Sequence, residues 1–140
     1  MFIEVTNESG RAFLERGISG PVTMLNLLRF RSEADYSAFP DLAPEEPITG
    51  RRAYDLYVAH TLPFLTAAGG SLTFAGTGGD YLIGPMDERW DVVMLVRYPS
   101  VQAFMGMTDN RAYLAGIGHR TAALEDSRLL PIDESDLRWT

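Results

Sequence analysis

Two segments of the chain are apolar on both of the faces that a β-strand presents. Residues 22–30, VTMLNLLRF, carry apolar side chains at even and at odd positions, and residues 90–98, WDVVMLVRY, do the same. A strand with one face in water alternates apolar and polar residues, whereas a strand covered on both faces is apolar throughout. We therefore predict two strands that are each buried on both faces.

Helical periodicity occurs in three other segments, at 7–17, 50–70 and 101–117. In each of them apolar residues recur at spacings of three and four. We predict Asn7 as the cap of the first helix, and the glycines at 116 and 118 as the end of the third. The result is one short leading helix and two longer ones.

Two shorter strands complete the pattern, at 71–77 and at 127–132, SRLLPI. After Gly78-Gly79, the residues 80–84, DYLIG, are predicted to continue the same ribbon past a bulge. The stretch 31–49 contains three prolines and is predicted to be mostly loop.

The predicted order is β-α-β-β-α-β with an extra helix in front. This order is typical of a ferredoxin-like α+β sandwich, with an antiparallel four-stranded sheet and both main helices on one face. We expect one domain over 1–140, comprising a leading helix within 1–20, a loop insertion at 31–49 and a tail at 133–140.

Two helices on one face leave the other face of this sheet uncovered. Because its central strands are apolar on both sides, the uncovered face must be closed by the leading helix or by a second copy of the sheet. We favour a homodimer in which the open sheet faces meet around a two-fold axis.

Composition removes several classes of chemistry. The 140 residues include no cysteine and no lysine, so thiolate nucleophiles, cysteine metal sites, Schiff-base lysines and the P-loop lysine are excluded. The net charge of −7 disfavours nucleic acid and anionic membranes as partners. With no apolar run long enough to span a bilayer and no signal-peptide pattern, a cytoplasmic location is expected.

Asn26 and Arg29 are the polar residues inside the first predicted strand. Strand parity places Asn26 with Met24 and Leu28, and Arg29 with Leu25 on the opposite face. Arg29 is near the strand end and is expected to reach water. Asn26 is in the middle of the strand and needs a buried partner or a wet pocket.

His60 and Tyr57 lie on the predicted helix 50–70 and are the candidate catalytic residues. An imidazole or a phenol in an aromatic pocket could act as a general base. The alternative for His60, which the sequence favours, is a partly buried helix histidine bonded to a neighbour.

Asn26, Arg97, His119 and Arg120 are the candidate ligand-binding residues. Asn26 could orient a ligand, and Arg97 or Arg120 could hold an anionic group bidentately. The alternative for Arg120 is an ion pair with Asp126 or Glu125, or bonds to helix-end carbonyls.

No metal site is predicted, because the two histidines, His60 and His119, have no short ligand spacing. No cofactor is predicted either. Either histidine alone could ligate haem, but no other feature of the sequence calls for it.

Several motifs resemble an uncharacterised dimeric α/β-barrel family. They are Tyr57 with LPFLTAAGG at 62–70, WDVVMLVRYPS at 90–100, and the pair Tyr113 and Arg120. The likeness covers roughly residues 22–131, and the loop insertion and leading helix depart from the shorter members. The resemblance implies two ferredoxin-like chains packed sheet to sheet around an interior able to hold a small ligand.

Two functions follow as hypotheses. The first is a cofactor-free homodimer that binds a small aromatic or carboxylate-bearing metabolite, acting as an isomerase or monooxygenase if it is an enzyme. The second is a non-catalytic ligand-binding or structural dimer, since this fold alone does not fix a function.

Overall fold

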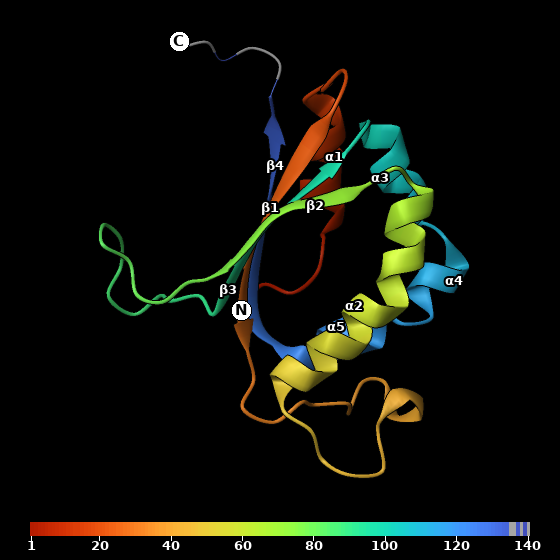
Figure 1. Cartoon of the computed structure of the whole chain (residues 1–140), viewed down its shortest axis with the longest axis vertical. Coiled ribbons are helices and arrows are strands. Elements are labelled where there is room, and N and C mark those ends of the chain that lie inside the picture. The colour runs from red at the N-terminus through yellow and green to blue at the C-terminus, as the bar shows by residue number, and fades with distance from the viewer. Residues whose placement is uncertain (135–136, 138, 140) are drawn as a thin grey trace.

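The fold is built on one antiparallel sheet of four strands in the order β2-β3-β1-β4 (Figure 1). The computed structural model describes residues 1–134, 137 and 139, so part of the predicted tail lies outside the described residues. The strands are β1 (Val22–Phe30), β2 (Ser71–Thr77), β3 (Val92–Tyr98) and β4 (Leu124–Asp133). This topology confirms the predicted ferredoxin-like α+β fold.

The helices occupy the connections between these strands and the segment before β1. They are α1 (Asn7–Glu15), the 3₁₀ turn η1 (Pro40–Leu42), α2 (Gly50–Ala67), α3 (Val101–Thr108), α4 (Arg111–Leu114) and α5 (Ile117–Ala123). Ser100 caps α3 and accepts a hydrogen bond from the Ala103 N–H at 3.0 Å.

Two helix boundaries differ from the predictions. Thr6, and not Asn7, caps α1: Thr6 Oγ1 accepts from the Ser9 N–H and Ser9 Oγ accepts from the Thr6 N–H, both at 3.0 Å. In the third helical segment, α4 ends at Leu114, just before Gly116 as predicted, but Gly118 ends nothing: a further helix, α5, begins at Ile117 and includes it.

The predicted continuation of β2 through residues 80–84 is wrong. β2 ends at Thr77. Beyond it, the Gly78 N–H donates to the Asp91 carbonyl, the Trp90 N–H donates to the Gly79 carbonyl and a single bridge joins Asp80 to Arg89, so the pairing reaches residue 80 but does not continue to 84. The bulge lies inside β2 instead, between Leu72 and Phe74. Residues 78–91 form an arm that extends from the sheet on the side away from α2 (Figure 1).

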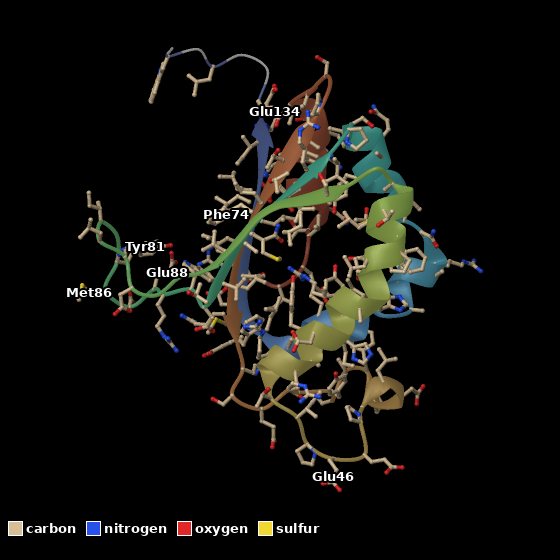
Figure 2. The ribbon with its side chains drawn as sticks, in the orientation of Figure 1. Glu46, Phe74, Tyr81, Met86, Glu88 and Glu134 are labelled. Atoms are coloured by element: carbon tan, nitrogen blue, oxygen red, sulfur yellow. The ribbon has the colours of Figure 1, made fainter. Side chains whose placement is uncertain are left out.

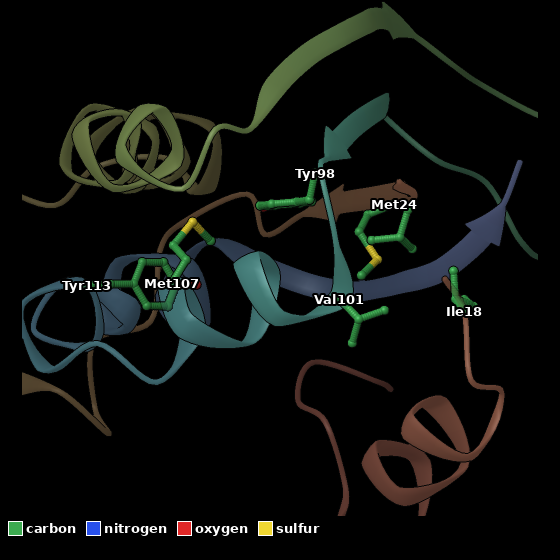
Figure 3. Packing of buried hydrophobic residues seen from close by; sticks show 7 residues of the cluster. Ile18, Met24, Tyr98, Val101, Met107 and Tyr113 are labelled. Carbon is green, nitrogen blue, oxygen red and sulfur yellow. The ribbon is translucent and has the colours of Figure 1, made fainter. Parts of the chain in front are cut away.

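The core lies between the helices and one face of the sheet, in two clusters. The first includes Met24 from β1 and Tyr98 from β3, packed with residues from α3 and α4 (Figure 3). The second is built around Leu28 of β1 and Tyr54 of α2. Phe13 of α1 packs against the first cluster, so the leading helix lies on the same side as the other helices.

The opposite face of the sheet, called the open face below, is therefore not covered by α1. Cross-strand partners share a face of the sheet, and the register places seven large apolar residues on this one. They are Leu25, Leu27, Phe74, Val93, Leu95, Leu130 and Ile132. Within the described chain, no helix has both the length and the apolar character needed to cross a bilayer.

Candidate functional site

Asn26 and Arg29 point to opposite faces of β1, as strand parity predicts. Met24 and Leu28, the neighbours of Asn26 on its face, are buried in the helix-side core. Arg29 lies on the open face. Contrary to the prediction, its side chain does not extend into water. Its side chain is 15% exposed and lies 3.6 Å from Glu125 and 3.8 Å from Asp126.

The candidate site lies on the helix side of the sheet, where the two core clusters meet. Met24 belongs to one cluster and Leu28 to the other, so Asn26 between them lies at their boundary. Tyr57 of α2 packs against both clusters. We call this region the tyrosine seam: Asn26, Tyr54, Tyr57, Tyr98, Tyr113 and Arg120. The Asn26 side-chain amide donates to the Met24 carbonyl at 3.2 Å.

The hydroxyls of Tyr57 and Tyr113 form the polar centre of the tyrosine seam. They are hydrogen-bonded to each other at 2.7 Å, which joins α2 to α4. The ring of Tyr57 also packs against that of Tyr54, with centroids 5.3 Å apart. Three phenols from two helices are therefore in one continuous aromatic cluster.

The hydroxyls of Tyr54 and Tyr98 have no hydrogen-bond partner in the described chain, although the two residues are only 6% and 5% exposed. Among described residues, the sealed polar side-chain atoms that lack a partner are Arg29 Nε and Thr61 Oγ1. The hydroxyl oxygens of Tyr54 and Tyr98 are not among these fully buried atoms, so each of the two oxygens is partly accessible to solvent.

Burial raises the pKa of Tyr54, Tyr98 and Tyr113, and the negative charge that a neighbouring Tyr57 phenolate would carry raises it further. The positive charge of Arg120 opposes this rise at Tyr54 and Tyr113. All three phenols are therefore protonated at neutral pH, and they act as hydrogen-bond donors and acceptors, not as bases.

Arg120 supplies the cation of the tyrosine seam. Its Nη1 donates to the Ile3 carbonyl at 2.6 Å, which ties α5 to the N-terminal segment. No described carboxylate lies within ion-pair distance of its guanidinium, so the pairing with Asp126 or Glu125 considered from the sequence is not seen. Asp126 and Glu125 face Arg29 instead.

Arg97 does not join the other candidates. It lies in register with Thr23 on the open face, and its guanidinium binds Glu134 at 2.9 Å. An anion held beside Asn26 on the other side of the sheet could not reach it.

His60 links α2 to α4. Its Nε2 donates to the carbonyls of Ala112 and Tyr113, at 2.8 and 3.1 Å, and its ring lies against Gly116, where any Cβ would overlap it. With Nε2 engaged as a donor, this geometry favours the structural alternative for His60 over the general base.

His119 faces the loop insertion, not the tyrosine seam. Its Nδ1 is 2.7 Å from the Tyr36 hydroxyl. Burial raises the pKa of Tyr36, so the phenol is protonated at neutral pH, and the imidazole tautomer sets which of the two groups is the donor. Burial, and secondarily the charge of His60, hold the pKa of His119 below its ordinary value of 6.5.

Acidification should therefore destabilise the fold through His119. Between the lowered pKa of His119 in the folded chain and 6.5, the unfolded chain binds more protons than the folded chain. The free energy of unfolding therefore keeps its full value above about pH 6.5 and falls as the pH drops below 6.5. We expect urea unfolding at fixed protein concentration to show a smaller loss from pH 8 to pH 5 in His119→Asn than in the wild type. Equal pH dependence in the two proteins would contradict this assignment.

Two hollows are found elsewhere on the surface. One, of about 350 Å³, lies on the open face and is lined by Leu25, Leu27, Arg128, Leu129 and Leu130. The other, of about 240 Å³, is formed by the loop insertion beside Tyr36. In the described residues no three metal-binding side chains gather into a cluster.

Sequence reasoning found Asn26, Tyr57 and Arg120 of the tyrosine seam but missed Tyr54 and Tyr98. Tyr54 lies one helical turn before Tyr57, so the pair was visible as part of an apolar helix face. The seam combines protonated phenols, an amide and a guanidinium. Such a set can bind and stabilise an anion, but it contains no side chain placed as an evident base.

The geometry defines the class as a ferredoxin-like α+β protein with a helix-side tyrosine and arginine site. No family model matches the chain, and no curated protein matches it. Two crystal structures of the RPA0582 protein, one of them methylated, are similar to it at 36% identity over 96% of this chain. The matches cover 96% and 98% of those chains, with TM-scores of 0.85 and 0.82.

The chain belongs to the family of the RPA0582 protein of Rhodopseudomonas palustris, which is itself described as a protein of unknown function. A dimeric ferredoxin-like protein of unknown function from Bacteroides fragilis is also similar, at 11% identity over 83% of this chain and 98% of its own, with a TM-score of 0.48.

Proposed function

We propose that this protein is a homodimer that binds a small aromatic or carboxylate-bearing metabolite in the tyrosine seam. The ring of the ligand would pack against the tyrosines, and its anionic group would lie at Arg120. The ligand we propose is a single substituted ring that carries one anionic group.

The observation that carries the binding proposal is the state of Arg120. A partly buried guanidinium loses hydration, which an opposite charge normally offsets. Arg120 has one backbone carbonyl, phenols nearby and no described carboxylate. A guanidinium presents several donors in a plane, so most of its hydrogen-bonding capacity is available to an anion.

The phenols add specificity to this anion site. Tyr54 and Tyr98 have hydroxyls without a partner in the described chain, and both are protonated at neutral pH. They can therefore donate to a carboxylate or to a ring oxygen that lies beside the guanidinium. The paired hydroxyls of Tyr57 and Tyr113 could serve a substrate enolate in the same way, but binding alone needs no base, and we propose binding as the function.

The dimer part of the proposal rests on the open face. Its seven apolar residues come from all four strands, and α1, which could have covered them, packs on the helix side. A continuous apolar sheet face is the kind of surface through which two copies pair around a two-fold axis.

Arg120→Gln should weaken binding of a single-ring carboxylate at least about tenfold, because it removes a charge-assisted contact. The probes are 4-hydroxybenzoate and its neutral analogue 4-hydroxybenzamide, titrated into the dimer by NMR and calorimetry. Arg120→Lys, which keeps the charge, should recover part of the affinity.

Arg11→Gln is the matched control, since it removes an exposed arginine of α1, away from both the seam and the open face, and should leave Kd for 4-hydroxybenzoate within about twofold of the wild type. Equal affinity of Arg120→Gln and wild type, or equal affinity for the benzoate and the benzamide, would show that Arg120 does not bind the anion.

A further inference from the structure

The arm formed by residues 78–91 carries the most exposed apolar side chains of the described chain before the tail. Leu82, Ile83 and Met86 at its tip are 101%, 92% and 90% exposed. Figure 2 shows Met86 at the end of the arm, far from the sheet and from α2. Three neighbouring apolar side chains that face water completely are unfavourable in an isolated chain, so this tip calls for a partner.

The arm has a defined structure at its base. Tyr81 OH donates to Glu88 at 2.6 Å, and Trp90 Nε1 donates to Tyr81 OH at 2.6 Å. Gly84 packs on the Tyr81 ring, where a Cβ would come within 2.6 Å of the ring atom Cδ2. The arm thus closes around Tyr81, which leaves Leu82, Ile83 and Met86 directed outward.

The base of the arm is fixed to the open face. Arg128 lies on that face in register with Leu27, and its Nη2 binds Glu88 at 3.0 Å. Its guanidinium also stacks on the Trp90 ring, 4.9 Å from the centroid, and Trp90 is buried. The arm therefore rises from the surface through which the proposed dimer forms, and a second copy on that surface would lie beside it.

We propose that the arm is a dimer clasp: the tip residues of one copy pack on the open face of the partner copy, in the apolar hollow lined by Leu25, Leu27 and Leu130. This inference rests on the proposed homodimer and adds to it the segment that holds the two copies together. Under two-fold symmetry each copy both gives an arm and receives one.

A second copy fits the tip better than a membrane does. Within the arm, the acidic residues Asp80, Asp87 and Glu88 outnumber Arg89, so the arm has the wrong charge for an anionic lipid surface. The hollow on the open face offers an apolar receptor of about 350 Å³ on the same surface as the base of the arm.

The absence of cysteine allows a direct test. In Ile83→Cys, the only thiol of the chain is at the tip of the arm. Its labelling by a maleimide should be at least tenfold slower above the dimer Kd, measured by sedimentation, than below it. The matched control is Leu62→Cys, on the exposed side of α2, which should react equally at both concentrations.

A second variant tests the energetic role of the tip. L82S/I83S/M86S should raise the dimer Kd at least tenfold while the circular dichroism spectrum stays that of the wild type. The control L14S/L56S/L62S removes three exposed apolar side chains from α1 and α2 and should leave the dimer Kd unchanged.

The outcomes separate the clasp from the dimer. A wild-type chain that stays monomeric would overturn both. A normal dimer in which Ile83→Cys reacts at full rate and the tip variant keeps its Kd would overturn the clasp alone. Pelleting of the wild type, but not the tip variant, with phosphatidylcholine vesicles would assign the tip to a membrane and also overturn the clasp.

Discussion

Phe74→Glu should convert the proposed homodimer into a monomer. Phe74 lies on the open face, in register with Leu95 of β3, which is in turn in register with Leu25 of β1; Figure 2 shows its place on β2. It is 55% exposed in one copy, so a carboxylate there remains hydrated in the monomer. In the dimer, two unpaired carboxylates would be buried among apolar residues, which should raise the dimer Kd on the order of 1,000-fold.

Leu72→Glu is the matched control for this prediction. Leu72 is in the same strand and is 52% exposed, but the bulge between the two residues leaves it in register with Val96, on the helix side. Analytical ultracentrifugation should give a monomer mass for Phe74→Glu and a dimer mass for Leu72→Glu. If both variants remain dimeric at low micromolar concentration, the open face is not the interface.

Gly50→Ala should destabilise the fold strongly. A Cβ on Gly50 would lie 2.6 Å from the Ala123 carbonyl oxygen and 2.8 Å from the Arg31 nitrogen, and it would overlap the Arg31 carbonyl oxygen. All three are backbone atoms, which cannot turn aside as a side chain can. We expect a loss of about 3 kcal/mol or more, equivalent to a Tm lower by roughly 10 °C.

Gly106→Ala, at another glycine inside a helix, should stabilise the fold instead. Gly106 is inside α3 and nothing lies within 4 Å of a Cβ placed there. Because alanine has the higher helix propensity, the variant should gain about 0.5–1 kcal/mol. Urea unfolding at fixed protein concentration measures both variants. Similar effects of the two substitutions would contradict the close contact at the start of α2.

The sequence predicted the sheet better than the helices. The bounds of β1 and β2 agree with the prediction, because each strand is an uninterrupted stretch of residues that is bounded by turn residues. The third helical segment was cut short because Gly116 and Gly118 look like helix ends. Gly118 serves packing instead: a Cβ there would meet Phe39 and Leu42 of the loop insertion. Only the tertiary contact reveals that role.

The candidate site could be predicted only in part, because several of its contacts also depend on tertiary packing. Asn26 could be assigned a face relative to Arg29 from strand parity alone. Arg97 could not be assigned a side, because β3 is apolar at odd and at even positions and the pattern does not say which set meets the helices. The contacts of His60 with the carbonyls of α4 depend on how α2 and α4 pack, which no local pattern encodes.

The sheet order also constrains how the chain folds during synthesis. β1 is a central strand, yet its two neighbours are β3 and β4, which begin at Val92 and Leu124. At roughly 5–20 residues per second, the segment VTMLNLLRF waits several seconds on the ribosome for its first partner. During that time it is an apolar, strand-forming segment with an unpaired edge, which is the kind of sequence that aggregates. Slowing translation upstream of β3 should therefore lower the soluble yield of this protein more than slowing it after β4.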